Sequence, residues 1–222
     1  KRKRRSYLQR WRRLGRNRQQ IAYIEKISMK KLITIIFFLG LGLSNVYSMQ
    51  PDVFVQSTVN RASEILSKNI SKQEKMNALK IIAKETVDIV GVGFYSLGST
   101  RKVLNDNQKQ KYFELFEDYF LKSFSSRLSE YTNPKIEVQS TKIINENYTI
   151  VNSVLVATPD RPEVKIDWRI YTKNLDNPLI RDLIIEGLSL ARTQKEEFAS
   201  ILNSNDGDIN ALFKTLENFT KN

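Results

Sequence analysis

The chain of 222 residues contains no cysteine and no histidine, and both absences limit what it can do. Without them there is no disulfide framework, no zinc site built from Cys or His, no cysteine nucleophile and no Ser-His-Asp triad. Any catalysis would have to use Asp, Glu, Lys, Tyr or Ser. We therefore predict that the protein is not an enzyme and carries neither a metal nor a cofactor.

The body of the chain also lacks an excess of either charge. The formal charge is +12, yet residues 1–28 hold 11 Lys or Arg against the single acid Glu25, and Lys30 and Lys31 supply the rest. From Met49 onward there are 23 basic and 23 acidic residues. This body has no basic excess to drive binding to a phosphate backbone. Only the 1–28 arm leaves a nucleic-acid-binding alternative open.

No apolar run is long enough to span a bilayer comfortably, since the longest, residues 32–43, has about twelve residues where about 20 are needed. Met29 and two lysines precede this run, and Val46-Tyr47-Ser48 after it resembles a cleavage site. The pattern predicts a cleavable secretory signal at residues 29–48, with an uncleaved anchor as the alternative. Residues 1–28 are then an upstream segment wrongly joined to the chain, and residues 49–222 form one exported domain.

An aromatic-rich stretch, residues 105–131, predicts the central helix of that domain. Its large apolar residues recur at helical spacing and cover a broad sector, too wide for one neighbouring element. Asn105 with Gln108 has the form of a capping box at the start of the helix. Such a helix is either an ordinary core helix or one wall of a site for a large apolar ligand.

Around this helix the pattern predicts other helices and then a sheet. Helical spacing follows Pro51 and the capping pair Ser71 and Glu74, and two glycines are expected to interrupt it before Phe94. Four β-rich segments then follow at residues 136–144, 148–157, 164–170 and 179–188, and a Thr193/Glu196 capping box opens the first C-terminal helix. The order predicts an α+β fold with helices packed on a four-stranded antiparallel sheet.

Several short motifs occur in the order seen in one known family. They are a Leu-Gly turn, a capped aromatic helix, an alternating strand, an Asp-x-x-x-Glu-Gly-x-Ser segment and a basic-x-x-Phe helix. Here they stand at Leu97-Gly98, Asn105 to Tyr131, Val164 to Arg169, Asp182 to Ser189 and Lys195 to Phe198. Over roughly residues 89–216 the chain thus resembles the MlaC family of periplasmic phospholipid-binding proteins, also called toluene-tolerance proteins. Arg101-Lys102 replaces the Trp-Arg pair of the family pattern.

The resemblance implies a monomeric periplasmic carrier that encloses phospholipid acyl chains in an apolar cavity. It would exchange lipid with an inner-membrane ABC transporter through an MlaD-type subunit, and with an outer-membrane lipoprotein–porin complex. Within the predicted fold we assign the cavity lining to apolar residues of the central helix, the segment before it and the sheet, each of which could equally be plain core. They are Ile89, Phe94, Phe113, Phe116, Phe120, Val154, Val156, Ile166, Trp168, Ile170, Leu183 and Ile185.

Two alternatives concern polar residues of the sheet. Asp182 and Glu186 are predicted on one strand face, where they would form the acid/base pair of an exported α+β enzyme with a polar pocket. Arg169 and Arg181 either contact a lipid phosphate or are solvated surface charges. An apolar site would exclude the enzyme.

Overall fold

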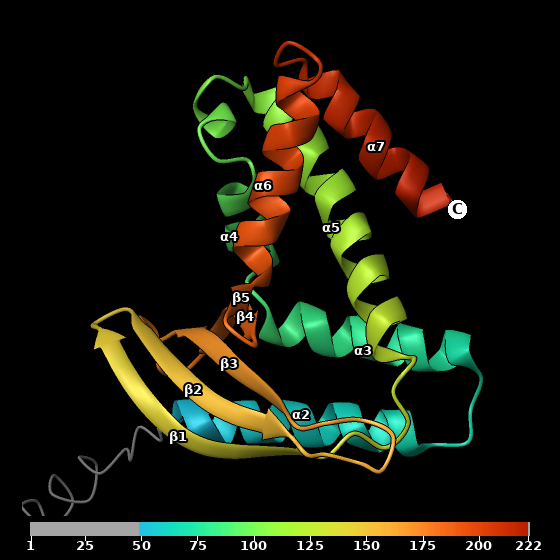
Figure 1. Cartoon of the computed structure of the whole chain (residues 1–222). Coiled ribbons are helices and arrows are strands. Elements are labelled where there is room, and N and C mark those ends of the chain that lie inside the picture. Colours follow the sequence, from blue (N-terminus) through green and yellow to red (C-terminus); the bar gives the residue numbers. More distant parts are fainter. Residues whose placement is uncertain (1–48, 222) are drawn as a thin grey trace, which may run out of the picture. The chain divides into compact units, whose positions relative to one another are not determined.

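The five-stranded antiparallel sheet of this protein has its strands in sequence order, β1-β2-β3-β4-β5. The computed structural model describes residues 49–221, so the predicted signal segment and the 1–28 arm lie outside it. Figure 1 shows α2 lying along the sheet, with α4, α5, α6 and α7 grouped beyond it. The elements are α2 Pro51–Ser67, α3 Lys72–Thr86, α4 Ile89–Ser96, η1 Thr100–Lys102, α5 Asp106–Leu128, β1 Ile136–Asn145, β2 Tyr148–Leu155, β3 Val164–Tyr171, β4 Leu179–Ile185, β5 Leu188–Ser189, α6 Leu190–Asn203 and α7 Ile209–Lys221.

The α+β fold and the antiparallel meander are as predicted, but the fourth predicted strand is in fact two. Glu186 and Gly187 have φ angles of 48° and 82°, so the chain reverses there and returns as the short β5. Two consecutive residues with positive φ are the mark of a tight two-residue hairpin turn, and glycine at the second position favours it. The sheet therefore has five strands where the sequence predicted four.

The first residues of α3, α5 and α6 can be compared with the three capping boxes that the sequence predicted. Both capping boxes predicted before α3 and α5 are present, at Ser71/Glu74 and Asn105/Gln108. The third prediction is wrong, because α6 begins at Leu190 and is capped by Ser189, whose hydroxyl oxygen accepts the backbone N–H of Arg192. A capping pattern inside a helix is a coincidence of spacing, since the cap must precede the first helical residue. Among the described residues no helix is long and apolar enough to cross a bilayer.

The predicted interruption at Gly91 and Gly93 is also wrong, since α4 runs through both glycines. A Cβ atom on Gly93 would lie 2.9 Å from the ring of Phe116, closer than such contacts normally allow. Glycine lowers helix propensity, but here it lets α4 approach the aromatic side of α5. Tertiary packing therefore explains this glycine.

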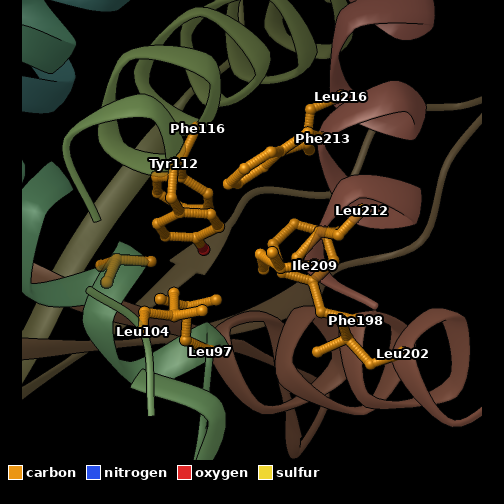
Figure 2. Close-up of a cluster of buried hydrophobic side chains, with 11 residues drawn as sticks. Leu97, Leu104, Tyr112, Phe116, Phe198, Leu202, Ile209, Leu212, Phe213 and Leu216 are labelled. Atoms are coloured by element: carbon orange, nitrogen blue, oxygen red, sulfur yellow. The ribbon is translucent and has the colours of Figure 1, made fainter. Parts of the chain in front are cut away.

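The buried side chains form two separate clusters, one in the helices and one between α2 and the sheet. The helical cluster, shown in Figure 2, joins α4, α5, α6 and α7 around the fully buried Tyr112 and Phe116. The sheet cluster joins Phe54, Val55 and Val59 of α2 to one face of β2, β3 and β4. Val87, between α3 and α4, packs against both clusters. The two cores therefore meet at the segment that leads into α4.

Tyr112 places a hydroxyl inside the helical cluster, and that hydroxyl donates a hydrogen bond to the Gly93 carbonyl oxygen at 3.1 Å. Burial raises the pKa of Tyr112 above its ordinary value of 10.0. The neutral phenol is thus the form that the fold stabilises. The contribution of the neutral Tyr112 to the free energy of unfolding is complete below pH 10 and is lost as the pH rises further.

We expect Tyr112→Phe to lower the free energy of unfolding by about 1 kcal/mol at neutral pH, because one buried hydrogen bond is lost. Above pH 10 the difference from wild type should shrink, since phenylalanine does not titrate. Urea unfolding between pH 7 and 11 measures both effects, with the exposed Tyr95→Phe as the control. Tyr119, whose pKa is also raised by burial, retains part of the alkaline dependence in both variants. A constant difference at every pH would contradict the expectation.

Candidate functional site

The most distinctive apolar feature outside the two cores is a ridge of phenylalanines along α5. Phe113, Phe120 and Phe124 lie at positions i, i+7 and i+11 and so share one side of the helix. Each of them is only partly buried. The rings of Phe120 and Phe124 stack at a centroid distance of 5.7 Å, and Phe94 of α4 packs edge-on against Phe113 at 4.4 Å. We call Phe113, Phe120 and Phe124 the aromatic ridge.

The neighbours of α5 show which of its sides the ridge occupies. Glu117 forms an ion pair with Lys84 of α3 at 2.6 Å, which marks the side toward α3. Tyr119 packs against Phe219 of α7 and Phe198 of α6, which marks the opposite side. Glu117 comes four residues after Phe113 and three before Phe120, so the ridge lies on the side of α5 that faces α3. Its rings are partly buried, and a separate side of α5 is exposed at Lys111, Glu114 and Asp118.

The structure places eight of the twelve predicted site residues in or against the two cores. Phe116 belongs to the helical cluster, and Ile89, Phe113 and Phe120 pack against it. A second group lies in or against the sheet cluster, namely Ile166, Trp168, Ile170 and Leu183. The predicted lining thus comes from both sides of the place where the two cores meet at Val87.

Four of the twelve residues fall outside both clusters. Phe94 contacts the ridge, and Val156 lies just past the end of β2. Ile185, at the end of β4, pairs with Ile166 and is partly buried. Val154 is buried on the opposite face from Trp168, because its neighbour Ser153 accepts the indole N–H of Trp168 and successive residues alternate between faces. The structure does not bring Val154 together with the others.

The sequence reasoning left out two residues that the structure places at this site. Phe124 completes the aromatic ridge, and its helical spacing from Phe120 was the available signal. Val87 lies between two helices and carries no periodic pattern. Only its bridge to Ile180 of β4 brings it between the two cores.

Arg181 and Arg169 each form an ion pair, one that joins β4 to the start of α4 and one that joins β3 to β4. Arg181 donates to Asp88, the N-cap of α4, at 2.6 Å, and its guanidinium lies 3.9 Å from the ring centroid of Tyr171. Burial of its side chain lowers the pKa of Arg181, but hydrogen bonds to Asp88 and Tyr148 outweigh this and raise it. Arg169 pairs with Asp182 at 3.4 Å. Arg181 is therefore engaged within the protein, whereas the Arg169 side chain is 44% exposed and remains partly solvated.

Asp182 has a structural task that uses both of its oxygens. Its carboxylate is almost fully buried, accepts the backbone N–H of Ala191 at 3.0 Å and accepts the Ser189 hydroxyl at 2.6 Å. It therefore anchors the first turn of α6, where a negative charge is also favoured by the helix dipole. The hydrogen bond between Asp182 and Ser189 crosses the β4–β5 hairpin, and it explains why these two residues are seven positions apart in the Asp-x-x-x-Glu-Gly-x-Ser motif.

Glu186 does not share a strand face with Asp182, so that prediction is wrong. It lies in the tight turn after β4, where its carboxylate accepts the backbone N–H of Lys165 at 2.6 Å. An acid/base pair needs both carboxyl groups directed at one substrate. The alternative of an enzyme built on Asp182 and Glu186 has no geometric support.

Two hollows on the described residues lie away from the twelve predicted positions. One, of about 410 Å³, runs along α2 beside Gln56 and Asn60. The other, of about 260 Å³, lies between α2 and the start of β1. None of the twelve lines either hollow. Within residues 49–221 there is also no cluster of three acidic residues arranged to hold a metal ion.

The fold and the ridge together define a class of protein. It is an α+β protein in which a curved meander carries one apolar core, a helical group carries another, and a partly open aromatic strip lies on the central helix. Asp182 and Glu186, the two groups considered for catalysis, are instead engaged in hydrogen bonds that hold the fold together.

Comparison with known proteins identifies the family within that class. Residues 56–218 match the MlaC protein family, and the chain belongs to it. The "intermembrane phospholipid transport system binding protein MlaC" of Haemophilus influenzae is 24% identical over 189 residues, which covers 80% of this chain and 88% of that protein. The fold is shared with the phospholipid-binding protein of Ralstonia solanacearum, solved in complex with a phospholipid, with a TM-score of 0.65 at 16% identity over 77% of this chain and 96% of that one.

Proposed function

We propose that the protein is a phospholipid carrier that holds acyl chains against the aromatic ridge, between its helical and sheet cores. The observation that carries the proposal is the ridge, a row of three phenylalanines that the helical core buries only in part. Membership of the MlaC family supports it, as do the phospholipid named for the Ralstonia protein and the transport system named for the Haemophilus protein.

The length of the ridge fits a single acyl chain. From Phe113 to Phe124 the helix rises about 16 Å, at about 1.5 Å per residue. The hydrocarbon core of a bilayer is about 30 Å thick, so a chain in one leaflet spans about 15 Å. One tail therefore matches the ridge along its whole length.

The energetics require the tails to be enclosed during transport. Two chains of about 15 methylenes each would cost about 24 kcal/mol to expose to water, at about 0.8 kcal/mol per methylene. Protein interiors are close-packed, and neither hollow described above lies at the ridge. Room for the tails then has to come from a small separation of the two cores where they meet at Val87, with α2 and the sheet moving relative to α5.

As a carrier the protein would work in the periplasm after removal of residues 29–48. It would pass lipid between the outer membrane and an ABC transporter of the inner membrane, docking to an MlaD-type subunit and to a lipoprotein–porin complex. Direction would come from partners that change its affinity for lipid, since binding and docking are linked. No bond is made or broken in such a cycle, so neither a cofactor nor a catalytic residue is needed.

Native mass spectrometry of the protein as cells produce it, followed by denaturing extraction, tests the proposal. A bound mass of phospholipid size that extracts into organic solvent supports it. Protein that carries no lipid, and takes up none from vesicles, would overturn the carrier function while leaving the fold intact.

Phe120→Ser is expected to weaken phospholipid binding by about tenfold to a hundredfold, because burying one large apolar side chain contributes about 1.5–3 kcal/mol. Phe219→Ser is the matched control. It makes the same chemical change where Phe219 contacts Tyr119, on the other side of α5. Titration with a fluorescent phospholipid measures both affinities. Equal losses in the two variants would show that the ridge is not the binding surface.

A further inference from the structure

The outer side of α4 and the turn that follows it carry a surface that the proposed lipid site does not use. Three apolar side chains are well exposed there, with Val103 81%, Val90 56% and Tyr95 43% accessible to solvent. Val103 directly follows the short helix η1 and its exposed residues Arg101 and Lys102. We call the six residues Val90, Tyr95, Arg101, Lys102, Val103 and Lys195 the α4–η1 patch.

Lys195 joins this surface from α6, which packs beside α4 (Figure 1). Its ammonium group lies 5.3 Å from the centre of the Tyr95 ring. Its aliphatic stem passes the turn at Gly98, where a Cβ atom would be 3.1 Å from the Lys195 Cε atom. Gly98 has a φ of 57°, so this left-handed turn leaves room for the lysine. An aromatic ring and a cation are thereby held together at the surface.

The charge of the patch has one sign. No acidic residue other than the N-cap Asp88, which is paired with Arg181, occurs between Val87 and Asn105. The next acid, Asp106, forms an ion pair with Lys109 at 3.2 Å. On α6, Lys195 is followed by Glu196, which pairs with Arg192, and by Glu197, which accepts from Gln194. The segregation of positive charge around exposed apolar groups therefore belongs to the segment between Val87 and Asn105.

We propose that the α4–η1 patch is a contact surface for a bilayer that contains anionic phospholipids. Basic side chains near such a surface are attracted by its negative potential. Tyrosine is enriched in the headgroup region of membranes, where small apolar groups can also insert. Val103 projects on a turn and needs no matching pocket, which a protein partner would have to supply. The charge complementarity and the projecting valine therefore favour a lipid surface over an acidic protein.

The proposed carrier function explains why such a membrane contact would be useful, because a carrier that binds a bilayer is held where lipid is exchanged. The contact surface itself does not depend on that function. The two are separable in the molecule. Arg101, Lys102 and Val103 of the patch follow α4 in the chain, whereas Phe94 within α4 contacts the aromatic ridge. Loss of cargo binding and loss of membrane contact are therefore expected from different substitutions.

Co-flotation of the protein with vesicles of phosphatidylcholine, with and without about a third of phosphatidylglycerol, tests the proposal. Arg101→Gln/Lys102→Gln is expected to lower partition onto the anionic vesicles by about 30-fold, the effect of two basic side chains near a charged surface. The control is Lys142→Gln/Lys173→Gln, two exposed lysines on β1 and on the loop after β3. It should change partition less than threefold. Every variant retains the same N-terminal residues, so their contribution cancels in the ratio.

Val103→Ser separates the apolar contribution, and we expect it to weaken partition by about threefold to tenfold on both vesicle types. All substituted side chains are exposed, so folding is not at risk. Equal partition of the Arg101/Lys102 variant and its control would overturn the proposal. Wild-type protein that does not float with anionic vesicles would also overturn it, and would direct the patch to an acidic protein partner.

Extraction of lipid from the same samples distinguishes this result from the carrier function. A patch variant with a full load of phospholipid and weak flotation supports membrane contact as a separate property. Flotation that depends on the patch in protein without any bound lipid would overturn the carrier function and leave the membrane contact standing.

Discussion

Trp168→Ala is expected to lower the free energy of unfolding by about 3–5 kcal/mol, the usual cost of removing a large aromatic side chain from a core. Trp168 is 8% exposed and lies in the sheet cluster. Its indole N–H donates to the Ser153 hydroxyl oxygen at 2.8 Å, and that hydroxyl donates to the Ile166 carbonyl oxygen at 2.9 Å. The substitution therefore removes a large apolar surface and one end of a buried chain of hydrogen bonds.

Two further variants divide this loss into its parts. Trp168→Phe keeps most of the apolar surface and should cost about 1–2 kcal/mol. Ser153→Ala leaves the indole N–H buried without an acceptor and should cost about 1–3 kcal/mol. Phe219→Ala, at a 40% exposed position on α7, is the control and should cost less than either. Denaturant unfolding measures all four variants. A Trp168→Ala loss below about 1 kcal/mol would show that neighbouring side chains fill the cavity, and the expectation would be wrong.

Asp182→Ala is expected to cost about 2–4 kcal/mol, because three groups lose their acceptor at once. They are the buried backbone N–H of Ala191, the hydroxyl of Ser189 and the guanidinium of Arg169. The start of α6 also loses the negative charge that its dipole favours. This carboxylate therefore joins the sheet to the helical group.

Arg169→Ala provides the matched comparison, because it removes the other member of the same ion pair. The Arg169 side chain is 44% exposed and its contact is the longest of the three at 3.4 Å, and Asp182 keeps its two shorter hydrogen bonds, so the cost should stay below about 1 kcal/mol. Hydrogen exchange at the Ala191 amide should speed up in the Asp182 variant and remain slow in the Arg169 variant. Similar losses in both would mean that the ion pair, and not the anchoring of α6, is what matters.

The same residues show how far sequence reasoning can reach. The aromatic helix, two capping boxes and the antiparallel meander were predicted correctly, because each rests on spacing within a short stretch of chain. Gly93 misled the prediction, since glycine weakens a helix by itself, and only the approach of Phe116 explains why it lies inside one. Asp182 was misleading too, since a carboxylate looks the same in sequence whether it anchors a helix or acts on a substrate.

The sequence by itself determined the class of this protein. The absence of cysteine and histidine and the neutral body excluded several functions, and the order of short motifs carried the resemblance to a family of phospholipid-binding proteins. Only the tertiary structure decided which apolar residues are core and which form an open ridge, because burial and lining select the same side chains. Trp168, predicted to line a cavity, lies within the sheet core, whereas Phe124 extends the ridge of α5. That difference depends on which elements pack together, and helical or strand periodicity records only the side that faces inward.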